Sequence, residues 1–550
     1  MRKRSSKAVS APPPAVNGSS EGHWKFTRTL AAVTLAAAVC KLVLAARTYG
    51  SNDVYAYERF FGWSQYLGVD LYQAAWDFNH PPSLLHFFRI LGWVTNPAGP
   101  WFPFWLRVPA ILADVGSVWI VLQILRVRLN QASVRMALLM FAAAPALILI
   151  SGFHGNTDSV MLVFLLLSVL LVEKRYTSLA GVAFGLSLCF KVVPVITLPV
   201  IYLYLADRRR RIAFLGVAGF TTLLAWSPYL LQSPATVLRH VFGYSSYYGH
   251  WGISYLTLQL AGAVPQLAFL NNFLQRYGAY LLLASIPLLS VHLHRAGAPL
   301  YAQVGLVFFY FLSLSTGFGV QYLAWIVPWT AGLGAIPTAI FYAASGAFLF
   351  LVYNYWSQGM PWFLADSNRV GDYQGHFDYY QLLCWLTAIL LAVTAARAAG
   401  LIRKPPSSQQ STAPNRNLAV ALLVAVFVII PFLLQVVQSP PGNLQAREGE
   451  VTATRAAQYL DLSTLLIQRQ RYPDAIKAAE TALQLDPRSA GAYNNMSVAY
   501  AAQGNWELSE HSAQKALEIQ PGFELARNNL QWARQRKQAE NQGASRSGAR

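Results

Sequence analysis

Apolar stretches recur along almost the whole chain and constrain its fold more than any other feature. Each is close to the roughly 20 residues that an α-helix needs to cross a bilayer. Of the 550 residues, 55% are hydrophobic and only 12% are charged, whereas soluble domains are about 25% charged. This composition excludes an ordinary soluble enzyme, a disordered chain and a fibrous repeat. It predicts an all-α protein built on a polytopic helical membrane domain.

Basic residues stand in short clusters between these apolar stretches. In a soluble protein the net charge of +19 would suggest nucleic acid as a partner. Here the placement is the positive-inside pattern of membrane proteins, so we expect no nucleic-acid partner. If every cluster faces the cytoplasm, the chain crosses the membrane about thirteen times and its C-terminal tail lies outside. The clusters are Arg2-Lys3-Arg4, Arg126 with Arg128, Lys174-Arg175, 208–211 and Arg403-Lys404.

The stretch 178–206 needs special treatment because it contains 29 residues before the next basic cluster. One straight helix of that length would extend about 43 Å, which exceeds the bilayer core of about 30 Å. It would also leave the arginines at 208–211 outside. Two shorter helices that meet near Lys191-Val192-Val193-Pro194 remove both problems, so we predict a break there.

The apolar pattern and the repeats together divide the chain into five parts. The predicted order is a basic cytoplasmic tail (1–28), a membrane domain (29–400), a polar linker (401–417), a last span (418–437) and a C-terminal domain (438–550).

The C-terminal part is polar, balanced in charge and repetitive. The sequence Ala482-Leu483-Gln484-Leu485-Asp486-Pro487 recurs 34 residues later as Ala516-Leu517-Glu518-Ile519-Gln520-Pro521. A 34-residue period with small residues inside and a closing proline is typical of tetratricopeptide repeats. We predict a small α-solenoid with repeats at 456–489 and 490–523 and a cap at 524–537. Two repeats are fewer than the usual three, so we expect the domain to be stabilised by packing against a partner or against the membrane domain.

Polar residues in the predicted outer segments are the candidates for chemistry, because ionisable groups at the membrane are costly unless they function. Asp53 follows the first span and could act as a base; it could equally be an N-cap of a short helix. Glu58 is interpreted as a surface pair with Arg59. His80 lies in a rigid turn. Lys191 interrupts an apolar stretch, where it could either meet an anionic phosphate or snorkel.

The short tip 151–159 offers His154, Asn156 and Asp158 as sugar or phosphate contacts, with helix capping by Asp158 or Thr157 as the alternative. Further outer candidates for substrate binding are Arg239, His250, Gln321 and Tyr322.

Other residue patterns, present or missing, limit which reactions and binding sites the chain could have. Arg107 and Asp114 are seven residues apart on one helical face, which favours an intramembrane ion pair. No nucleotide-binding loop, serine-hydrolase elbow or zinc motif is present. The three cysteines lie in apolar runs and indicate neither disulfides nor a metal site.

Several of these motifs occur together in the order found in one family. They are Phe78-Asn79-His80-Pro81-Pro82, Gly155-Asn156-Thr157-Asp158-Ser159, Leu179-Ala180-Gly181, Phe190-Lys191-Val192-Val193-Pro194 and Gln321-Tyr322-Leu323-Ala324-Trp325. In this respect residues 29–400 resemble the multi-span GT-C glycosyltransferases. The likeness is closest to polyprenyl-phosphate-mannose-dependent mannosyltransferases, including the GPI-type group and bacterial relatives.

The resemblance implies an inverting hexosyltransferase. It would move a hexose, mannose in the closest relatives, from a polyprenyl-phosphate carrier to a lipid, glycan or protein acceptor. Asp53 would be the catalytic base, and Lys191 and Arg239 would stabilise the leaving phosphate. Many relatives carry a second acidic residue beside the base, where this chain has Val54. A divalent cation therefore stays open, and no metal ligand is assigned.

The predicted topology, together with the resemblance, indicates a place in the cell and a use for the repeats. We expect a multi-pass protein of the bacterial plasma (inner) membrane in contact with membrane lipid. Its repeats would lie on the outer, periplasmic face and hold a protein partner near the site.

Three other readings remain open at this point. A polymerase or ligase of lipid-linked glycans would use arginine and histidine in a large outer loop, as at Arg239 and His250. A transporter is expected to show two related halves, which the sequence lacks. A membrane scaffold that presents the repeats would need neither Asp53 nor Lys191.

Overall fold

A computed structural model describes residues 20–67, 71–95, 101–244, 246–402, 425–438 and 441–547. The prediction of an all-α membrane protein with a C-terminal helical solenoid is confirmed: in the described residues, the only strands are two-residue pairs. Most of the predicted basic tail and linker lies outside the described residues.

Apolar helices make up the membrane domain, and seven described helical runs are long and apolar enough to cross a membrane. Four shorter apolar helices and two further helices, 158–173 and 323–330, accompany them. The helices are α1 (Ser20–Arg47), α5 (Phe102–Ile124), α6 (Ala132–Ala142) with α7 (Pro145–Leu149) and the π-helical turn η2 (Ile150–His154), α8 (Asp158–Glu173), α9 (Thr177–Phe190), η3 (Val193–Thr197) with α10 (Leu198–Tyr204), α11 (Arg208–Leu230), α14 (Ala268–Ala296), α15 (Leu300–Leu314), α16 (Leu323–Thr330), α17 (Ala335–Trp356), α19 (Asp378–Ala398), and η7 (Ala425–Ile429) with α21 (Ile430–Gln438).

The predicted helix break lies where the sequence placed it. Helix α9 ends at Phe190, and Lys191 has an extended backbone with φ −151° and ψ 147°. A short 3-10 helix then begins at Val193 and leads into α10. Pro194 explains why α9 does not continue, because a proline has no N–H for the helix hydrogen bond.

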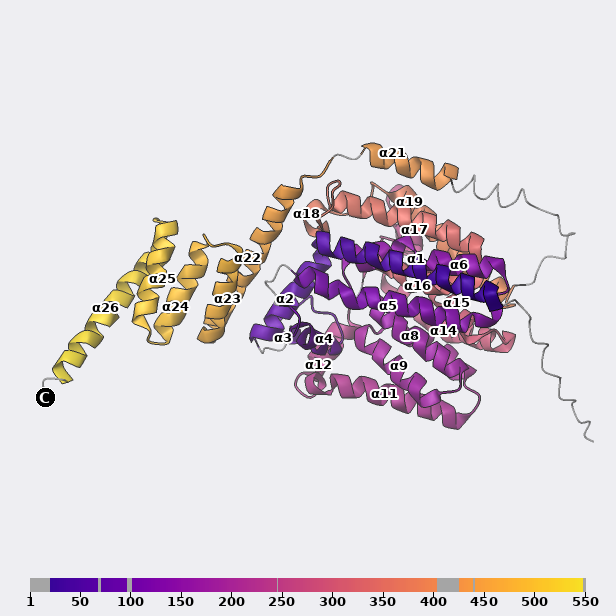
Figure 1. Cartoon of the computed structure of the whole chain (residues 1–550), viewed down its shortest axis with the longest axis horizontal. Coiled ribbons are helices and arrows are strands. Elements are labelled where there is room, and N and C mark those ends of the chain that lie inside the picture. The colour runs from indigo at the N-terminus through magenta and orange to yellow at the C-terminus, as the bar shows by residue number, and fades with distance from the viewer. Residues whose placement is uncertain are drawn as a thin grey trace, which may run out of the picture.

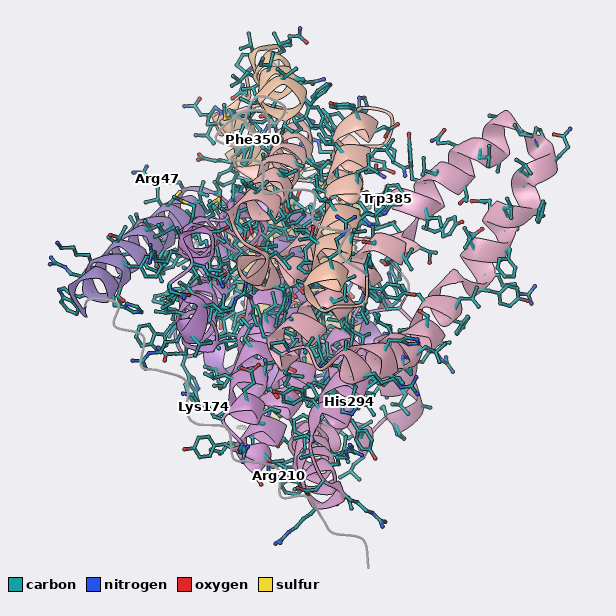
Figure 2. The ribbon with its side chains drawn as sticks, turned by 90° about the vertical axis from the view of Figure 1, so that its right-hand side faces the viewer. Arg47, Lys174, Arg210, His294, Phe350 and Trp385 are labelled. Atoms are coloured by element: carbon teal, nitrogen blue, oxygen red, sulfur yellow. The ribbon has the colours of Figure 1, made fainter. Side chains whose placement is uncertain are left out.

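Basic turns gather at one end of the membrane domain. In Figure 1 the α8–α9 and α10–α11 turns lie at the end away from the repeats. Figure 2 views that end and shows Lys174, Arg210 and His294 from three separate turns in the lower part of the molecule. Arg128, in the turn η1 (Arg126–Arg128), donates to the Gly332 carbonyl in η6 (Ala331–Leu333) at 3.0 Å. The described turns with Lys174 and Arg210 thus share an end, as the positive-inside pattern requires. The predicted clusters Arg2-Lys3-Arg4 and Arg403-Lys404 lie outside the described residues.

The segments predicted as outer loops form the opposite end, which we call the repeat-side face. It contains β1 (Gly50–Ser51), α2 (Asn52–Leu67), α3 (Leu71–Ala74), α4 (Ser83–Leu91), α12 (Pro234–Phe242), β2 (Tyr247–Tyr248), α13 (Gly252–Ala263), η4 (Pro265–Leu267), β3 (Gly317–Phe318), η5 (Val320–Tyr322), β4 (Leu364–Ala365) and α18 (Ser367–Val370). Strand β1 pairs in parallel with β4, and β2 pairs antiparallel with β3. A separate buried core of aromatic residues, including Phe60, Phe78 and Phe88, fixes α2, α3 and α4 on one another.

The C-terminal helices form a solenoid beside the repeat-side face (Figure 1). They are α22 (Leu444–Gln468), α23 (Tyr472–Leu485), α24 (Ala490–Ala502), α25 (Trp506–Ile519) and α26 (Glu524–Ser547). Their core contains small residues such as Ala475, Ala479 and Ala492, which let neighbouring helices approach closely. Helices α22 and α23 also contact α2, so the short solenoid packs against the membrane domain.

Candidate functional site

Four segments far apart in the sequence converge on the repeat-side face. They are the start of α2, the turn from η2 into α8, the break after α9, and the η5–α16 junction. Each brings one or more predicted site residues: Asp53, then His154, Asn156 and Asp158, then Lys191, then Tyr322. Because the last three segments are breaks or junctions between membrane helices, they can present polar groups without interrupting a spanning helix.

Asp53 and His154 form the first half of this cluster. His154 Nε2 lies 2.9 Å from Asp53 Oδ2. The Ser51 hydroxyl donates to the His154 carbonyl at 2.7 Å and accepts from the Asp53 amide at 3.2 Å, so it fixes both residues. The His154 side chain is 4% exposed and that of Asp53 is 34% exposed. The carboxylate therefore stays reachable from outside the protein.

The surroundings keep Asp53 ionised. Burial acts to raise the pKa of its carboxyl group, but attraction and hydrogen bonding from His154 outweigh burial, with a further contribution from Lys191. The net effect lowers the pKa of Asp53 below its ordinary value. A carboxylate that is ionised, partly exposed and held in place is suited to accept a proton.

Asp158 and Lys191 form the second half. Lys191 Nζ lies 3.1 Å from Asp158 Oδ1, and the Trp325 indole donates to the same oxygen at 2.9 Å. The side chain of Asp158 is fully buried, while that of Lys191 is 19% exposed. The Asn156 side chain accepts from the Asp158 amide at 3.1 Å, which fixes the turn just before α8. Asp158 thus orients Lys191 toward the cluster.

Four polar atoms of the turn 154–158 are buried without a hydrogen-bond partner among the described residues. They are Nδ1 of His154, Nδ2 of Asn156, Oγ1 of Thr157 and Oδ2 of Asp158. Buried polar groups are nearly always satisfied, and each exception calls for an explanation such as a water or a ligand. The turn therefore has hydrogen-bonding capacity left for such a molecule.

Aromatic rings surround the cluster. His80 lies 5.1 Å from the ring of Tyr57, and burial lowers the pKa of His80 to about 3, so this histidine is neutral at pH 7. Tyr322 stacks on Trp325 with ring centroids 3.9 Å apart. Neutral aromatic faces of this kind suit the apolar face of a sugar ring.

Three other predicted site residues form no hydrogen bond or ion pair with the charged groups of the cluster in the described part of the chain. Arg239 is exposed on α12, and its role beside Lys191 stays a prediction. His250 Nε2 instead lies 3.1 Å from Asp372 Oδ2 and links two outer segments. The Gln321 side chain folds back against Gly319, where an added Cβ would lie 2.8 Å from its Oε1. The partner of His250 is 122 positions away, and local sequence does not reveal it.

Arg107 is the supporting residue that the sequence misassigned. Asp114 pairs with Lys41 of α1 at 2.6 Å, so the predicted Arg107–Asp114 pair is wrong. Arg107 is fully buried and donates only to neutral oxygens of the segments before Asp53 and His154 and to one oxygen of its own helix. The acceptors are the Thr48 hydroxyl and the carbonyls of Thr48, Tyr49, Gly152, Phe153 and Pro103.

Two glycines in the sequence, Gly50 and Gly155, could have indicated that these two segments approach each other closely around Arg107. Gly50 has φ +116° and a Cβ there would lie 2.7 Å from the Phe153 carbonyl. Gly155 has φ +82° and a Cβ would lie 3.4 Å from the Arg107 side chain. Both positions therefore require glycine, which lets the two segments close around the guanidinium.

Comparison with known proteins gives two matches. Residues 27–257 match the family model of the GPI transamidase subunit PIG-U, and residues 465–504 match a model of the TPR repeat. No curated protein matches the chain. The first match covers less than half of the chain but includes Asp53, His154, Asp158 and Lys191. The protein is therefore a multi-span membrane protein similar over this part to a membrane subunit, with a confirmed repeat region, whereas its GT-C resemblance stays a prediction.

Proposed function

We propose that the protein transfers a hexose from a polyprenyl-phosphate carrier to an acceptor hydroxyl, with Asp53 as base. This proposal rests mainly on one observation. Asp53, which is ionised and partly exposed, and Lys191, which is held by Asp158, belong to one cluster on the repeat-side face. The match to a GPI transamidase subunit supports the proposal that the substrate is linked to a lipid of the membrane. Mannose is the sugar favoured by the resemblance in the sequence.

The proposed reaction is a single displacement. The acceptor oxygen forms a bond to the anomeric carbon while the bond from that carbon to the phosphate oxygen breaks. Asp53 takes the hydroxyl proton, and the polyprenyl phosphate leaves with its negative charge. Attack opposite to the leaving group inverts the anomeric carbon. Lys191 is the cation of the cluster, and stabilises the growing phosphate charge.

A metal ion has no step in this mechanism. Among the described residues, no group of three or more histidine, cysteine, aspartate or glutamate side chains could hold one. Glu58, the carboxylate nearest in sequence to Asp53, is already paired with Arg455. The residues present therefore do not fit a protein-bound divalent cation.

Replacing Lys191 tests the leaving-group role. We expect Lys191→Gln to lower kcat about 10²–10³-fold, because removing one group that stabilises developing charge has an effect of this size. Lys191→Arg should keep more of the rate since it keeps the charge. The measurement is steady-state transfer of radiolabelled hexose, together with a thermal unfolding midpoint.

Arg239→Gln is the matched control, because Arg239 is an exposed cation of the same face outside the cluster. Its rate should stay near that of the unchanged protein. Equal losses in the Lys191→Gln and Arg239→Gln variants would contradict the assignment of Lys191.

The pH dependence tests the Asp53–His154 contact. Asp53 must be ionised to act, so the rate falls as pH falls through its pKa, which lies below the ordinary value of about 3.9. In His154→Ala, burial remains while the attraction of His154 is lost, so the pKa rises. We expect the acid limb of kcat against pH to move to higher pH. An unmoved limb in this variant would show that His154 does not tune Asp53.

The direct experiment uses the purified full-length protein with radiolabelled polyprenyl-phosphate mannose or glucose and extracted membrane acceptors. Labelled product is expected with at least one donor. A non-catalytic subunit that binds a lipid-linked substrate is the second candidate, favoured by the PIG-U match. It predicts donor binding without transfer, and equal binding by Asp53→Asn.

The proposed orientation places the repeats and the cluster on the periplasmic side of a bacterial plasma membrane, where the repeats could hold a protein partner. The common end of the basic turns supports this orientation. Labelling of single cysteines placed at 175 and 500 with an impermeant reagent is expected to modify only the second in intact cells. The reverse pattern would overturn the orientation.

A further inference from the structure

The solenoid meets the membrane domain through a buried ion pair. Glu58 of α2 has a fully buried side chain, and both of its carboxylate oxygens accept from Arg455 Nε of α22, at 2.8 and 2.9 Å. The two residues are 397 positions apart. This pair replaces the predicted Glu58–Arg59 surface pair, since Arg59 instead contacts Asp77.

Tyr49 completes this arrangement from the other side of Asp53. Its hydroxyl donates to Glu58 Oε2, and the Arg455 guanidinium lies 5.8 Å from its ring centroid. The backbone amide of Tyr49 also donates to the Phe363 carbonyl at 2.8 Å. Arg455 therefore contacts residues four positions before and five positions after Asp53.

Further contacts seat the same helix on the same face. An added Cβ at Gly62 would lie 3.0 Å from the Tyr459 hydroxyl, so α22 packs closely on α2 there. Arg447 donates to Gln358 at 2.6 Å, and Arg369 of α18 pairs with Glu450 at the exposed edge. The contact thus has a buried centre and a polar edge, as stable interfaces do.

From these contacts we infer that α22 belongs to the scaffold of the site and that Arg455 is a positioning residue for Asp53. This inference rests on the proposed function. Arg455 acts through Glu58 and Tyr49, which hold the two ends of the segment 49–58 that carries Asp53. The repeats are then a fixed part of the enzyme rather than an appended adaptor.

The free-energy cost of burying a charge explains why the loss of Arg455 would disturb the segment that carries Asp53. A buried ion pair is stable only when its hydrogen bonds are satisfied, and removing one partner leaves an uncompensated charge. Without Arg455, Glu58 must take up a proton or move toward water. Either change alters the turn that aims Asp53, and a misplacement near 1 Å lowers catalytic rates about 10²-fold.

The test compares Arg455→Ala, Arg455→Lys and Arg369→Ala in the full-length protein. For Arg455→Ala we expect amide hydrogen exchange across α2 to become about tenfold faster. We also expect kcat to fall about 10²-fold with little change in KM for the donor, because Lys191 lies on a different segment. Arg455→Lys keeps the charge but loses the planar fork, so smaller changes in both quantities are expected.

Arg369→Ala is the control, since it breaks an exposed pair between the same two parts of the protein, and exposed pairs contribute little. It should leave α2 exchange and kcat unchanged. If Arg455→Ala does not fold, the Arg455→Lys variant supplies both readings. Unchanged exchange across α2 in a folded Arg455 variant would overturn the inference. Hydrogen exchange reports the structure of α2 whether or not the protein catalyses transfer. If the wild-type protein has no transferase activity, only the proposed function fails, and the exchange result still tests the role of Arg455.

Discussion

Asp53→Asn is expected to lower the rate of hexose transfer about 10²–10⁴-fold, the contribution of a positioned general base. Asparagine has nearly the same shape and keeps an oxygen within reach of His154, so the fold should stay intact. It cannot accept the hydroxyl proton of the acceptor, because an amide is far less basic than a carboxylate. The loss should therefore appear in kcat rather than in donor binding.

The measurement is transfer of radiolabelled hexose at saturating donor, paired with donor binding and a thermal unfolding midpoint. Asp372→Asn is the matched control: it also removes a carboxylate that contacts a histidine on the repeat-side face, but lies outside the cluster. Asp372→Asn should keep its activity. Normal turnover in the Asp53→Asn variant would refute the base assignment and favour the non-catalytic candidate.

Arg107→Leu is expected to destabilise the protein by on the order of 3 kcal/mol or more, since hydrogen bonds to charged groups contribute about 1.5–3 kcal/mol each. The guanidinium is fully buried and makes contacts of 2.6–3.2 Å to the chain before Asp53 and around η2. Leucine leaves these carbonyls without a donor. Arg107→Lys should also be destabilised, because one ammonium cannot reproduce the fork.

Unfolding midpoints in detergent measure this effect, and the transfer assay measures its consequence at the site. Arg128→Gln is the control, because Arg128 contacts the Gly332 carbonyl at the opposite end and is less buried. It should change stability much less. An Arg107→Leu protein with an unaltered midpoint would show that the buried arginine does not hold the two segments together.

Local sequence was sufficient for much of the architecture. The lengths of the apolar stretches predicted the helical membrane domain, and the 34-residue period predicted the solenoid. The break before Pro194 followed from one residue that cannot continue a helix. The sequence also singled out Asp53, His154, Asp158 and Lys191, which the fold brings together, because a polar side chain at a break between apolar helices is costly wherever the chain folds.

Partners across the fold were not predictable in the same way. Arg107 and Asp114 share a helical face, yet Asp114 pairs with Lys41 and Arg107 binds carbonyl oxygens. Arg239 looked as suitable as Lys191 for a phosphate, but it faces outward on α12. Sequence spacing gives the face of one helix and does not give its rotation against its neighbours.

The sequence by itself determined the helices, their break and the repeats, because hydrophobic length, proline and periodicity act within a few turns of the chain. Only the tertiary structure decided which charges meet. The pair of Glu58 with Arg455 joins residues 397 positions apart, and its formation depends on the packing of α22 against α2. Buried charges take the partner that packing brings within hydrogen-bonding distance, so their pairing is a property of the assembled fold.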